Sequence, residues 1–133
     1  ILLYDPVHGA GAIVHAGRAG TFQGIAGEAV GVMAARYQSD PAELIVVIGP
    51  SAGPCCYEVG EDIRLRFVKN GGVSEGTRLD LWTSNANQLL NMGVSSENVE
   101  VSEICTICSG EFHSYRKSNT ASRNLAVLGL ERP

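Results

Sequence analysis

His15 is the residue whose position most suggests chemistry, because it stands at the end of a run expected to form a strand. Residues 11–14 are small or apolar, and glycines follow the histidine at positions 17 and 20. An imidazole held by a rigid strand makes a good metal ligand or general base, and glycines let a ligand approach the backbone closely. By residue type alone, a structural histidine hydrogen-bonded to a loop is the commoner explanation.

Cationic side chains gather in two places that could bind an anion. Arg18 precedes an expected helix that begins near Thr21, and helix N-termini attract anions through free N–H groups and the helix dipole. Residues 113–123 contain three cationic side chains, Arg116 and Arg123 among them, and no carboxylate, although the chain carries a net charge of -4. This contrast favours a small anionic ligand over general polyanion binding. A tight turn and a solvated basic loop are the respective alternatives.

The four cysteines fall in two close pairs, Cys55–Cys56 and Cys105–Cys108. A four-cysteine zinc site is conceivable, but neighbouring residues on extended backbone point in opposite directions, so Cys55 and Cys56 would not easily share one metal. A redox pair normally starts a helix, whereas Cys105 ends an expected strand. Buried, small thiols are therefore the expectation, and reduced cysteines indicate a cytoplasmic protein.

Alternating strands and helices are expected to position these residues. Apolar, β-branched runs predict strands, and apolar residues at helical spacing, such as Ile25, Ala29, Val32 and Met33, predict helices. This alternation indicates a layered α/β domain, and the histidine and both cysteine pairs lie just beyond strands, where open α/β sheets gather ligands. The expected strands are residues 1–5, 11–15, 44–48, 99–104 and 125–128, and the expected helices are 22–38, 60–69 and 80–92.

The composition limits the class of protein. The chain has 133 residues, enough for one domain with a buried core, and 44% of them are hydrophobic. A net charge of -4 argues against a general nucleic-acid or membrane-surface binder, which needs a basic face. No run reaches the ~18 apolar residues of a membrane span, and no signal peptide is visible. Because the chain opens within an expected strand, we expect a further segment upstream.

Four sequence blocks together resemble one protein family. IVHAGRAGT (13–21) resembles the family's HAGWRGT, and GPSAGPCCYEVG (49–60) resembles its highly specific GPxIGPCCYEVG. Residues 79–108 and 112–130 are similar to its LDL…N…QL…GV…CT…C and FxSxRR…TGR patterns. This is the laccase-domain family, also called YfiH-like proteins or multicopper polyphenol oxidases, and the resemblance runs across essentially the whole chain.

The resemblance implies a single α/β domain over residues 1–133, with layered, mixed sheets flanked by helices (an α+β arrangement), similar to the catalytic domain of cytotoxic necrotising factors. The chain looks like the C-terminal part of a member and lacks the N-terminal portion. Members have been assigned phosphorylase activity on adenosine, inosine and methylthioadenosine, and adenosine deaminase activity. The implied partners are a small-molecule nucleoside and phosphate. The alternatives are a copper-dependent polyphenol oxidase (laccase), a cysteine hydrolase and a non-catalytic fragment.

The resemblance also implies a metal site of two histidines and one cysteine, in which His15 matches one of the histidines. The other two ligands belong to Gln-Val-His-type and Ala-Asp-Cys motifs that lie upstream in the family. Zinc is the expected metal and copper the alternative, and one neutral imidazole alone does not hold zinc firmly. In deamination, zinc would activate a water for attack on C6 of adenine. Three histidines, at positions 8, 15 and 113, are too few for a multicopper centre.

Substrate-binding residues follow from the same motif match. Arg116 and Arg123 occupy the family's SxR and TGR positions and are expected to bind phosphate or a polar edge of the substrate. Arg18 stands one position before the family's usual arginine and is a further candidate for phosphate. Cys56 and Cys105 are expected to line the site. The motif match assigns no general base, no preferred nucleoside and no oligomeric state.

Overall fold

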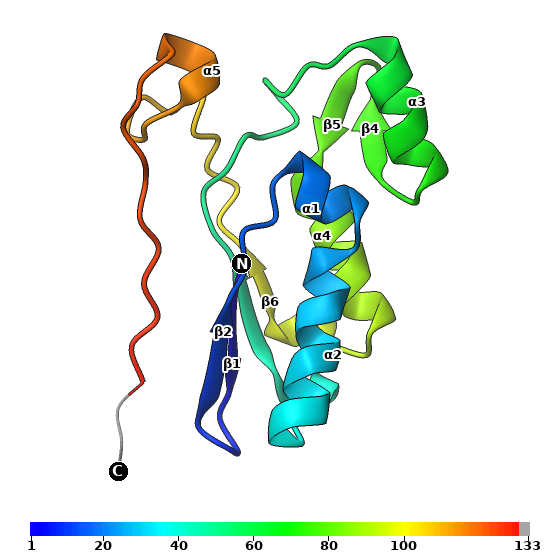
Figure 1. Ribbon diagram of the computed structural model, residues 1–133, viewed down its shortest axis with the longest axis vertical. Helices are drawn as coiled ribbons and strands as arrows, with labels where there is room; N and C mark the ends of the chain where they lie inside the picture. The colour runs from blue at the N-terminus through cyan, green and yellow to red at the C-terminus, as the bar shows by residue number, and fades with distance from the viewer. Residues whose placement is uncertain (131–133) are drawn as a thin grey trace.

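A four-stranded mixed sheet lies at the centre of the chain in a computed structural model, which describes residues 1–130. The strands run in the order β2 (Ala10–Ile13), β1 (Leu2–Asp5), β3 (Ile45–Ile48) and β6 (Val99–Val101) (Figure 1). β1 pairs antiparallel with both β2 and β3, whereas β3 and β6 pair in parallel. β2, β3 and β6 therefore point the same way, and their C-terminal ends meet at one edge of the sheet.

Two long helices, α2 (Ile25–Tyr37) and α4 (Leu81–Asn91), cover one face of this sheet (Figure 1). The extended C-terminal segment runs past the other face. None of the described helices has the length and apolarity that crossing a membrane requires. The remaining elements are α1 (Arg18–Phe22), η1 (Pro41–Glu43), α3 (Glu61–Lys69), β4 (Val73–Glu75), β5 (Arg78–Asp80), η2 (Ser96–Asn98) and α5 (Tyr115–Ser118).

The main hydrophobic core lies between the sheet and these two helices. Side chains alternate along a strand, so β1 and β3 direct Leu3, Val46 and Ile48 toward the helices. Full burial of such a side chain contributes about 1.5–3 kcal/mol. A smaller cluster ties α3 to the β4–β5 hairpin. The helix residues of the main core are Ala26, Val30, Met33 and Leu89, and the smaller cluster contains Val59, Phe67, Leu79 and Leu81.

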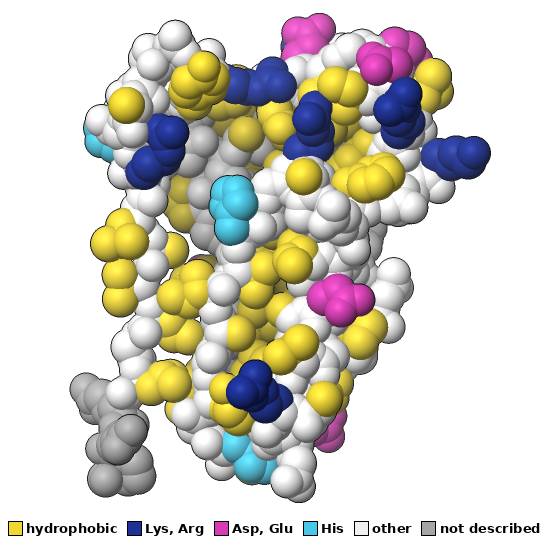
Figure 2. All heavy atoms as spheres, viewed as in Figure 1, with side chains coloured by type: hydrophobic (Ala, Val, Ile, Leu, Met, Phe, Trp, Pro, Cys, Tyr) yellow, Lys and Arg dark blue, Asp and Glu magenta, His cyan; other side chains and the backbone are white. Residues whose placement is uncertain are grey.

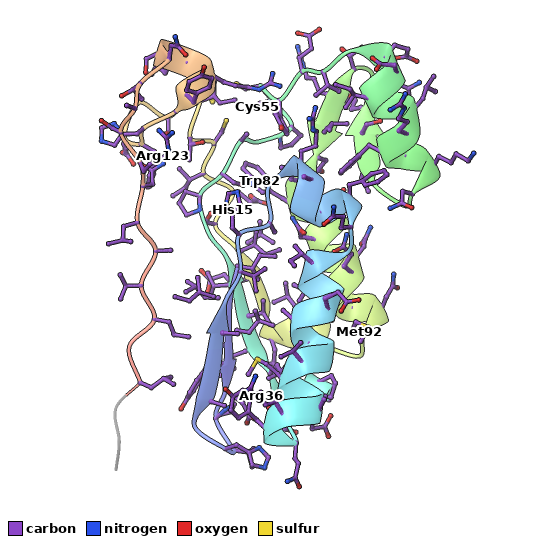
Figure 3. The ribbon with its side chains drawn as sticks, viewed as in Figure 1. His15, Arg36, Cys55, Trp82, Met92 and Arg123 are labelled. Atoms are coloured by element: carbon purple, nitrogen blue, oxygen red, sulfur yellow. The ribbon has the colours of Figure 1, made fainter. Side chains whose placement is uncertain are left out.

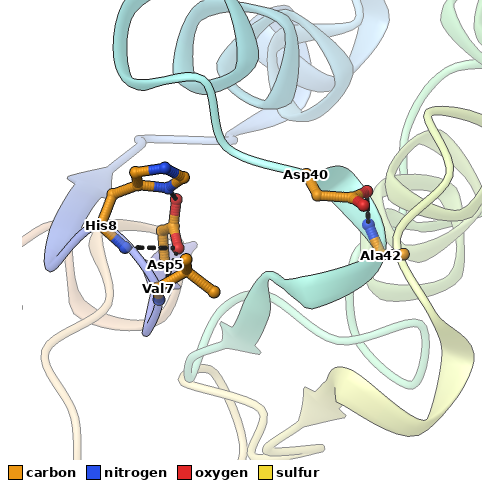
Figure 4. Close-up of polar contacts among 5 residues, drawn as sticks. All are labelled: Asp5, Val7, His8, Asp40 and Ala42. Atoms are coloured by element: carbon orange, nitrogen blue, oxygen red, sulfur yellow. Dashed lines mark hydrogen bonds and ion pairs between the residues drawn. The ribbon is translucent and has the colours of Figure 1, made fainter.

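The turn between β1 and β2 is held by the buried carboxylate of Asp5 (Figure 4). The amides of Val7 and His8 donate to Asp5 Oδ1 at 2.8 and 3.1 Å, and His8 Nδ1 lies 2.8 Å from Asp5 Oδ2. Burial would raise the pKa of Asp5, but hydrogen bonds, those of His8 and Val7 among them, outweigh it and lower the pKa to about 2. Asp40 plays a similar capping role at η1, where it accepts from the Ala42 amide at 3.0 Å.

The helix expected over residues 22–38 is in fact two helices. Gly24 adopts a left-handed φ of 80° and separates α1 from α2, a conformation that side chains other than glycine rarely adopt. The buried stripe of α2 includes Val30 and Met33, whereas Val32, another of the apolar residues at helical spacing, is 53% exposed. Apolar residues occur on more than one side of α2, so spacing alone does not select the buried side.

The strand expected at residues 125–128 is wrong. This segment is extended but pairs with no strand among residues 1–130, and Leu125 and Val127 are 88% and 73% exposed. Leu128 instead packs on Gly11, where a Cβ atom would lie 2.6 Å from the leucine methyl group. An apolar pattern alone does not make a strand, because its residues can also pack on a face of the sheet, as this segment does (Figure 1).

Candidate functional site

The C-terminal ends of β2, β3 and β6 bring the candidate residues together, as the sequence predicts. His15 lies two residues beyond β2, the loop that carries Cys55 follows β3, and Cys105 follows β6. Figure 3 shows His15 and Cys55 at this end of the molecule, with Arg123 facing them from the C-terminal segment. A parallel bridge between Ser51 and Cys105 continues the pairing of β3 and β6 into these loops.

The His15 side chain is exposed. Its ring lies over Gly17, where a Cβ atom would come within 3.0 Å of Nε2, so glycine at this position leaves room for the imidazole. Unlike the His8 ring, the His15 ring has no hydrogen-bond partner within residues 1–130, and its nitrogens are open to a ligand. Figure 3 shows His15 between the body of the molecule and the C-terminal segment, and Figure 2 shows a histidine exposed on the surface in this region.

The loop that carries His15 is anchored to the core by Thr21 of α1. Thr21 Oγ1 donates to the Ala16 carbonyl at 3.1 Å. Asn85 and Gln88 of α4 donate to Thr21 Oγ1 and to its carbonyl at 3.1 and 2.7 Å. These hydrogen bonds connect the residue next to His15 with a core helix, and support of this kind keeps a functional group in place.

The four cysteines form one cluster. Their Sγ atoms all lie within 4.8 Å of one another, and those of Cys55 and Cys108 are 3.7 Å apart. The expectation of extended backbone at Cys55–Cys56 is wrong, because the amides of Cys56 and Tyr57 both donate to the Gly53 carbonyl at 3.0 Å. This turn brings both thiols to the same side of the backbone. The cluster could therefore hold a metal ion.

Close backbone approach builds this cluster. The Gly53 amide donates to Cys105 Sγ at 3.3 Å. A Cβ atom at position 53 would lie 2.6 Å from the Trp82 ring and 3.1 Å from Cys105 Cβ, so a larger residue would push the loop away. Trp82 Nε1 also donates to Ser51 Oγ at 2.6 Å. The GPSAGP loop is thus fixed between α4 and the segment that follows β6.

The thiols differ in acidity. Burial would raise the pKa of Cys105, but the backbone N–H groups of Gly53, Cys108 and Ile107 outweigh it and lower the pKa to about 6. Desolvation of the sulfur, together with hydrogen bonds to the neighbouring thiols, raises the pKa of Cys55 to about 12. The backbone donors therefore favour the ionised form at Cys105 more than at Cys55.

Arg116 is held in a defined orientation beside residues 51–58, the loop that carries Cys55 and Cys56 and is called the thiol loop. Its Nη1 donates to the Glu58 carbonyl at 2.6 Å, and its guanidinium carbon lies 4.5 Å from the centroid of the Tyr57 ring. A guanidinium has five N–H donors, so most remain available for an anion. Sequence reasoning did not assign Tyr57 and Glu58, although both belong to the GPCCYEVG block and directly follow the cysteine pair.

Arg123 and Arg18 have different surroundings. Arg123 Nη1 donates to three carbonyls of residues 120–122, at 3.3, 2.8 and 3.0 Å, so this side chain folds back on its own loop. Arg18 begins α1 and lines a pocket between α1 and α3 together with Arg66 and Phe67. Arg116 therefore lies beside the thiol loop, whereas Arg18 lines a different pocket with Arg66. The sequence gave no indication that Arg66 would be a neighbour of Arg18.

The chain resembles known proteins over nearly its full length. A family model described as multi-copper polyphenol oxidoreductase laccase matches residues 1–131. The chain belongs to this family. A purine nucleoside phosphorylase of Bacteroides thetaiotaomicron is 38% identical over 128 residues, covering 88% of this chain and 47% of the relative. Purine nucleoside phosphorylase YlmD of Geobacillus stearothermophilus is 37% identical over 141 aligned positions, covering 97% of this chain and 52% of the relative.

Solved structures of this laccase family share the fold. YlmD from Geobacillus stearothermophilus superposes with a TM-score of 0.80 at 32% identity, covering 89% of this chain and 48% of that one. The YfiH protein of Bacillus licheniformis superposes with a TM-score of 0.78 at 33% identity and the same coverage. The expected α/β class is thereby confirmed. The chain spans about half the length of the curated relatives it matches.

Two sets of potential metal ligands differ in completeness. The cysteine cluster supplies four sulfur atoms close together. By contrast, within residues 1–130 His15 is not joined by two further histidine, cysteine or carboxylate ligands. Among residues 1–130, His15 therefore does not form a metal site by itself.

Proposed function

We propose that this chain supplies phosphate- and nucleoside-binding residues to a zinc-dependent purine nucleoside phosphorylase acting on adenosine, inosine and methylthioadenosine, with adenosine deaminase activity in addition. The observation that carries the proposal is similarity over 88% and 97% of the chain to relatives named purine nucleoside phosphorylases. The exposed His15 and the oriented Arg116 support it. The four unpaired cysteines support a cytoplasmic location.

Arg116 is the proposed phosphate ligand with the strongest structural support. Its guanidinium is exposed, yet its contacts with the Tyr57 ring and the Glu58 carbonyl limit its orientation. A cation that is ordered in advance loses less conformational entropy when it binds, and its remaining donors can bind two phosphate oxygens. Arg123 and Arg18 are the further proposed phosphate-binding residues, and Cys56 and Cys105 the proposed site-lining residues.

The proposed reaction transfers the ribose from the purine to phosphate. A phosphate oxygen bonds to C1′ of the ribose while the bond between C1′ and the purine nitrogen breaks, and the purine leaves with the electron pair. Holding the phosphate anion in line with C1′ and balancing its charge are the tasks we give to Arg116. Phosphorolysis then depends on positioning and electrostatics, and we assign no described residue as the general acid.

His15 is proposed as one ligand of the family's zinc ion. The other ligands would come from the part of the family's length that this chain does not span. One imidazole among the described residues does not make a metal site by itself. Deamination therefore enters the proposal through the family resemblance alone.

A copper-dependent polyphenol oxidase is the second candidate, favoured by the description of the matching family. Multicopper chemistry needs grouped histidines. His8 is bound to Asp5 at the other end of the sheet, and the group of potential metal ligands found among the described residues contains no histidine. Oxidation of a phenol by copper-loaded protein, independent of phosphate, would favour this candidate over the phosphorylase.

The deciding assay follows adenosine, inosine and methylthioadenosine with and without phosphate. Purified protein that also contains the part carrying the other proposed zinc ligands is expected to release the free base only when phosphate is present. The second product should be ribose 1-phosphate from adenosine and inosine, and methylthioribose 1-phosphate from methylthioadenosine. Conversion of adenosine to inosine without phosphate would support the deaminase activity. A chain that neither binds nor converts any nucleoside would establish the non-catalytic alternative and reject the phosphorylase for these residues.

Arg116→Gln tests the phosphate ligand. Loss of charge-assisted hydrogen bonds worth about 1.5–3 kcal/mol should raise the KM for phosphate roughly tenfold to 100-fold. Arg36→Gln is the matched control, because Arg36 is an exposed arginine near the end of α2, far from the thiol loop (Figure 3). Equal phosphate KM values in the two variants would contradict the role given to Arg116.

A further inference from the structure

The four cysteine sulfurs lie close enough together to bind a single metal ion. All four Sγ atoms lie within 4.8 Å of one another. In a tetrahedron with metal–sulfur bonds of about 2.3 Å, neighbouring sulfurs are about 3.8 Å apart. The Sγ atoms of Cys55 and Cys108 are 3.7 Å apart, so this pair already has the separation of one tetrahedral edge. The group contains no carboxylate and no histidine.

The backbone around the cluster is arranged to support negative sulfur. Cys55 and Cys56 lie on a turn closed onto the Gly53 carbonyl, and Cys105 begins the turn that contains Cys108. The backbone N–H group of Gly53 donates to Cys105 Sγ at 3.3 Å. Donors of this kind stabilise the thiolate form in which sulfur binds a metal.

We propose that Cys55, Cys56, Cys105 and Cys108 form a structural tetrathiolate zinc site, separate from the metal site to which His15 belongs. Four sulfur ligands in tetrahedral geometry favour zinc among the common divalent ions. Because all four positions are filled by protein, this ion has no open position for substrate and its role is structural. Binding releases the remaining thiol protons to water.

The bound ion would join two loops that come from different strands. Residues 51–58 follow β3 and residues 105–108 follow β6. The backbone bridge between Ser51 and Cys105 already connects the two loops. The first loop also carries Tyr57 and Glu58, which orient Arg116. Zinc would therefore make this end of the molecule rigid and fix the positions of Tyr57 and Glu58, which orient Arg116, whatever ligand that arginine binds.

A disulfide is the competing state of the same sulfurs. The closest pair, Cys55 and Cys108, would have to approach from 3.7 Å to about 2.0 Å. Such a bond would use two of the four thiols and leave Cys56 and Cys105 within 4.8 Å of it without a role. The metal accounts for all four cysteines, and the disulfide accounts for two.

The test is a cobalt titration of the reduced, metal-free chain without oxygen. Cobalt(II) occupies zinc sites and gives thiolate-to-metal absorption that reports bound sulfur. We expect one equivalent to saturate this absorption, one equivalent of zinc to abolish it, and zinc to slow alkylation of Cys55 and Cys108, the two exposed thiols. Zinc should also raise the thermal unfolding midpoint, because it binds the folded state.

Variants of exposed cysteines keep the test interpretable, since they disturb the fold least. Cys55→Ser and Cys108→Ser should each weaken cobalt binding at least tenfold and lose part of the thiolate absorption. His15→Ala should leave that absorption unchanged, which separates this site from the proposed catalytic metal. Absence of thiolate absorption in the wild type, full absorption in both serine variants, or a Cys55–Cys108 disulfide that forms despite excess zinc would overturn the proposal.

Discussion

His8 and His15 lie at opposite ends of the central sheet and differ in whether their rings have hydrogen-bond partners. At the β1–β2 turn, His8 is paired with the buried Asp5 carboxylate at 2.8 Å, and two backbone amides satisfy the other carboxylate oxygen. The opposite end, where His15 and the four cysteines follow β2, β3 and β6, is called the open edge. There the His15 ring has no hydrogen-bond partner within residues 1–130 and lies over the backbone of Gly17. The first end uses its polar groups internally, whereas the second leaves them open to a ligand.

This contrast extends beyond the histidines. Near the turn, the core side chains Leu3, Leu44 and Val46 are fully buried. At the open edge, Cys55 and Cys108 are exposed, and Arg116 has donors to spare. The packed end supplies the stability that allows the open end to keep unsatisfied polar groups, as functional sites commonly do.

The largest effect should come from the packed region. Leu89→Ala removes a fully buried side chain of α4 and should cost about 2–5 kcal/mol of unfolding free energy, measured by denaturant titration. Leu90→Ala, at the adjacent and 41% exposed position, is the matched control and should cost far less. Equal losses in the two variants would show that stability does not reside in this core.

The next effect concerns the Asp5 turn. Asp5→Asn removes the charge that accepts from two amides and His8, and should cost about 1–3 kcal/mol. The folded-state pKa of Asp5 is about 2, below the usual value of about 3.9. The carboxylate therefore stabilises the fold fully above about pH 4, and this contribution is lost as the pH falls through about 2.

The pH profile gives this second prediction its control. Unfolding free energy of the wild type should fall between about pH 4 and pH 2, whereas that of Asp5→Asn should be flatter over the same range. Asp40→Asn is a suitable comparison, because Asp40 is an exposed cap and asparagine caps equally well. A wild type and an Asp5→Asn variant with the same acid profile would contradict the assignment.

Sequence reasoning located the open edge well, because strand ends leave strong local signals. The apolar runs before His15, Gly49 and Cys105 predicted strands, and the parallel direction of these strands brings their ends together. The family motifs pointed to the same segments. The prediction of extended backbone at Cys55–Cys56 was wrong, because the turn there depends on hydrogen bonds to the Gly53 carbonyl that residue type does not reveal.

Two further differences from the sequence predictions depend on contacts between residues far apart in the chain. The apolar residues 125–128 look like a strand, but they lie along a face of the sheet and pair with neither of its edge strands, β2 and β6. The Arg116–Tyr57 contact joins residues distant in sequence, so the proximity of their motifs could not be read from spacing. The left-handed Gly24 splits one expected helix into two, although glycine is also tolerated within helices.

A smaller effect should come from the link between the two regions. Trp82 of α4 donates from Nε1 to Ser51 Oγ at 2.6 Å, which ties the core helix to the thiol loop. Trp82→Phe and Ser51→Ala should each cost about 0.5–1.5 kcal/mol through this hydrogen bond. In a double-mutant cycle their losses should not add, since both remove the same bond. Strictly additive losses would mean that the two ends are energetically independent.

The smallest effect on stability should come from His15 itself. His15→Ala removes an exposed ring without a partner in the described residues and should change the unfolding free energy by less than about 0.5 kcal/mol. His8→Ala removes the partner of a buried carboxylate and should cost about 1 kcal/mol or more. If His15→Ala is the more damaging of the two, the ring has a structural role and the distinction between the ends of the sheet fails. If it is nearly neutral in folding but abolishes phosphorolysis, the open edge has the function proposed for it.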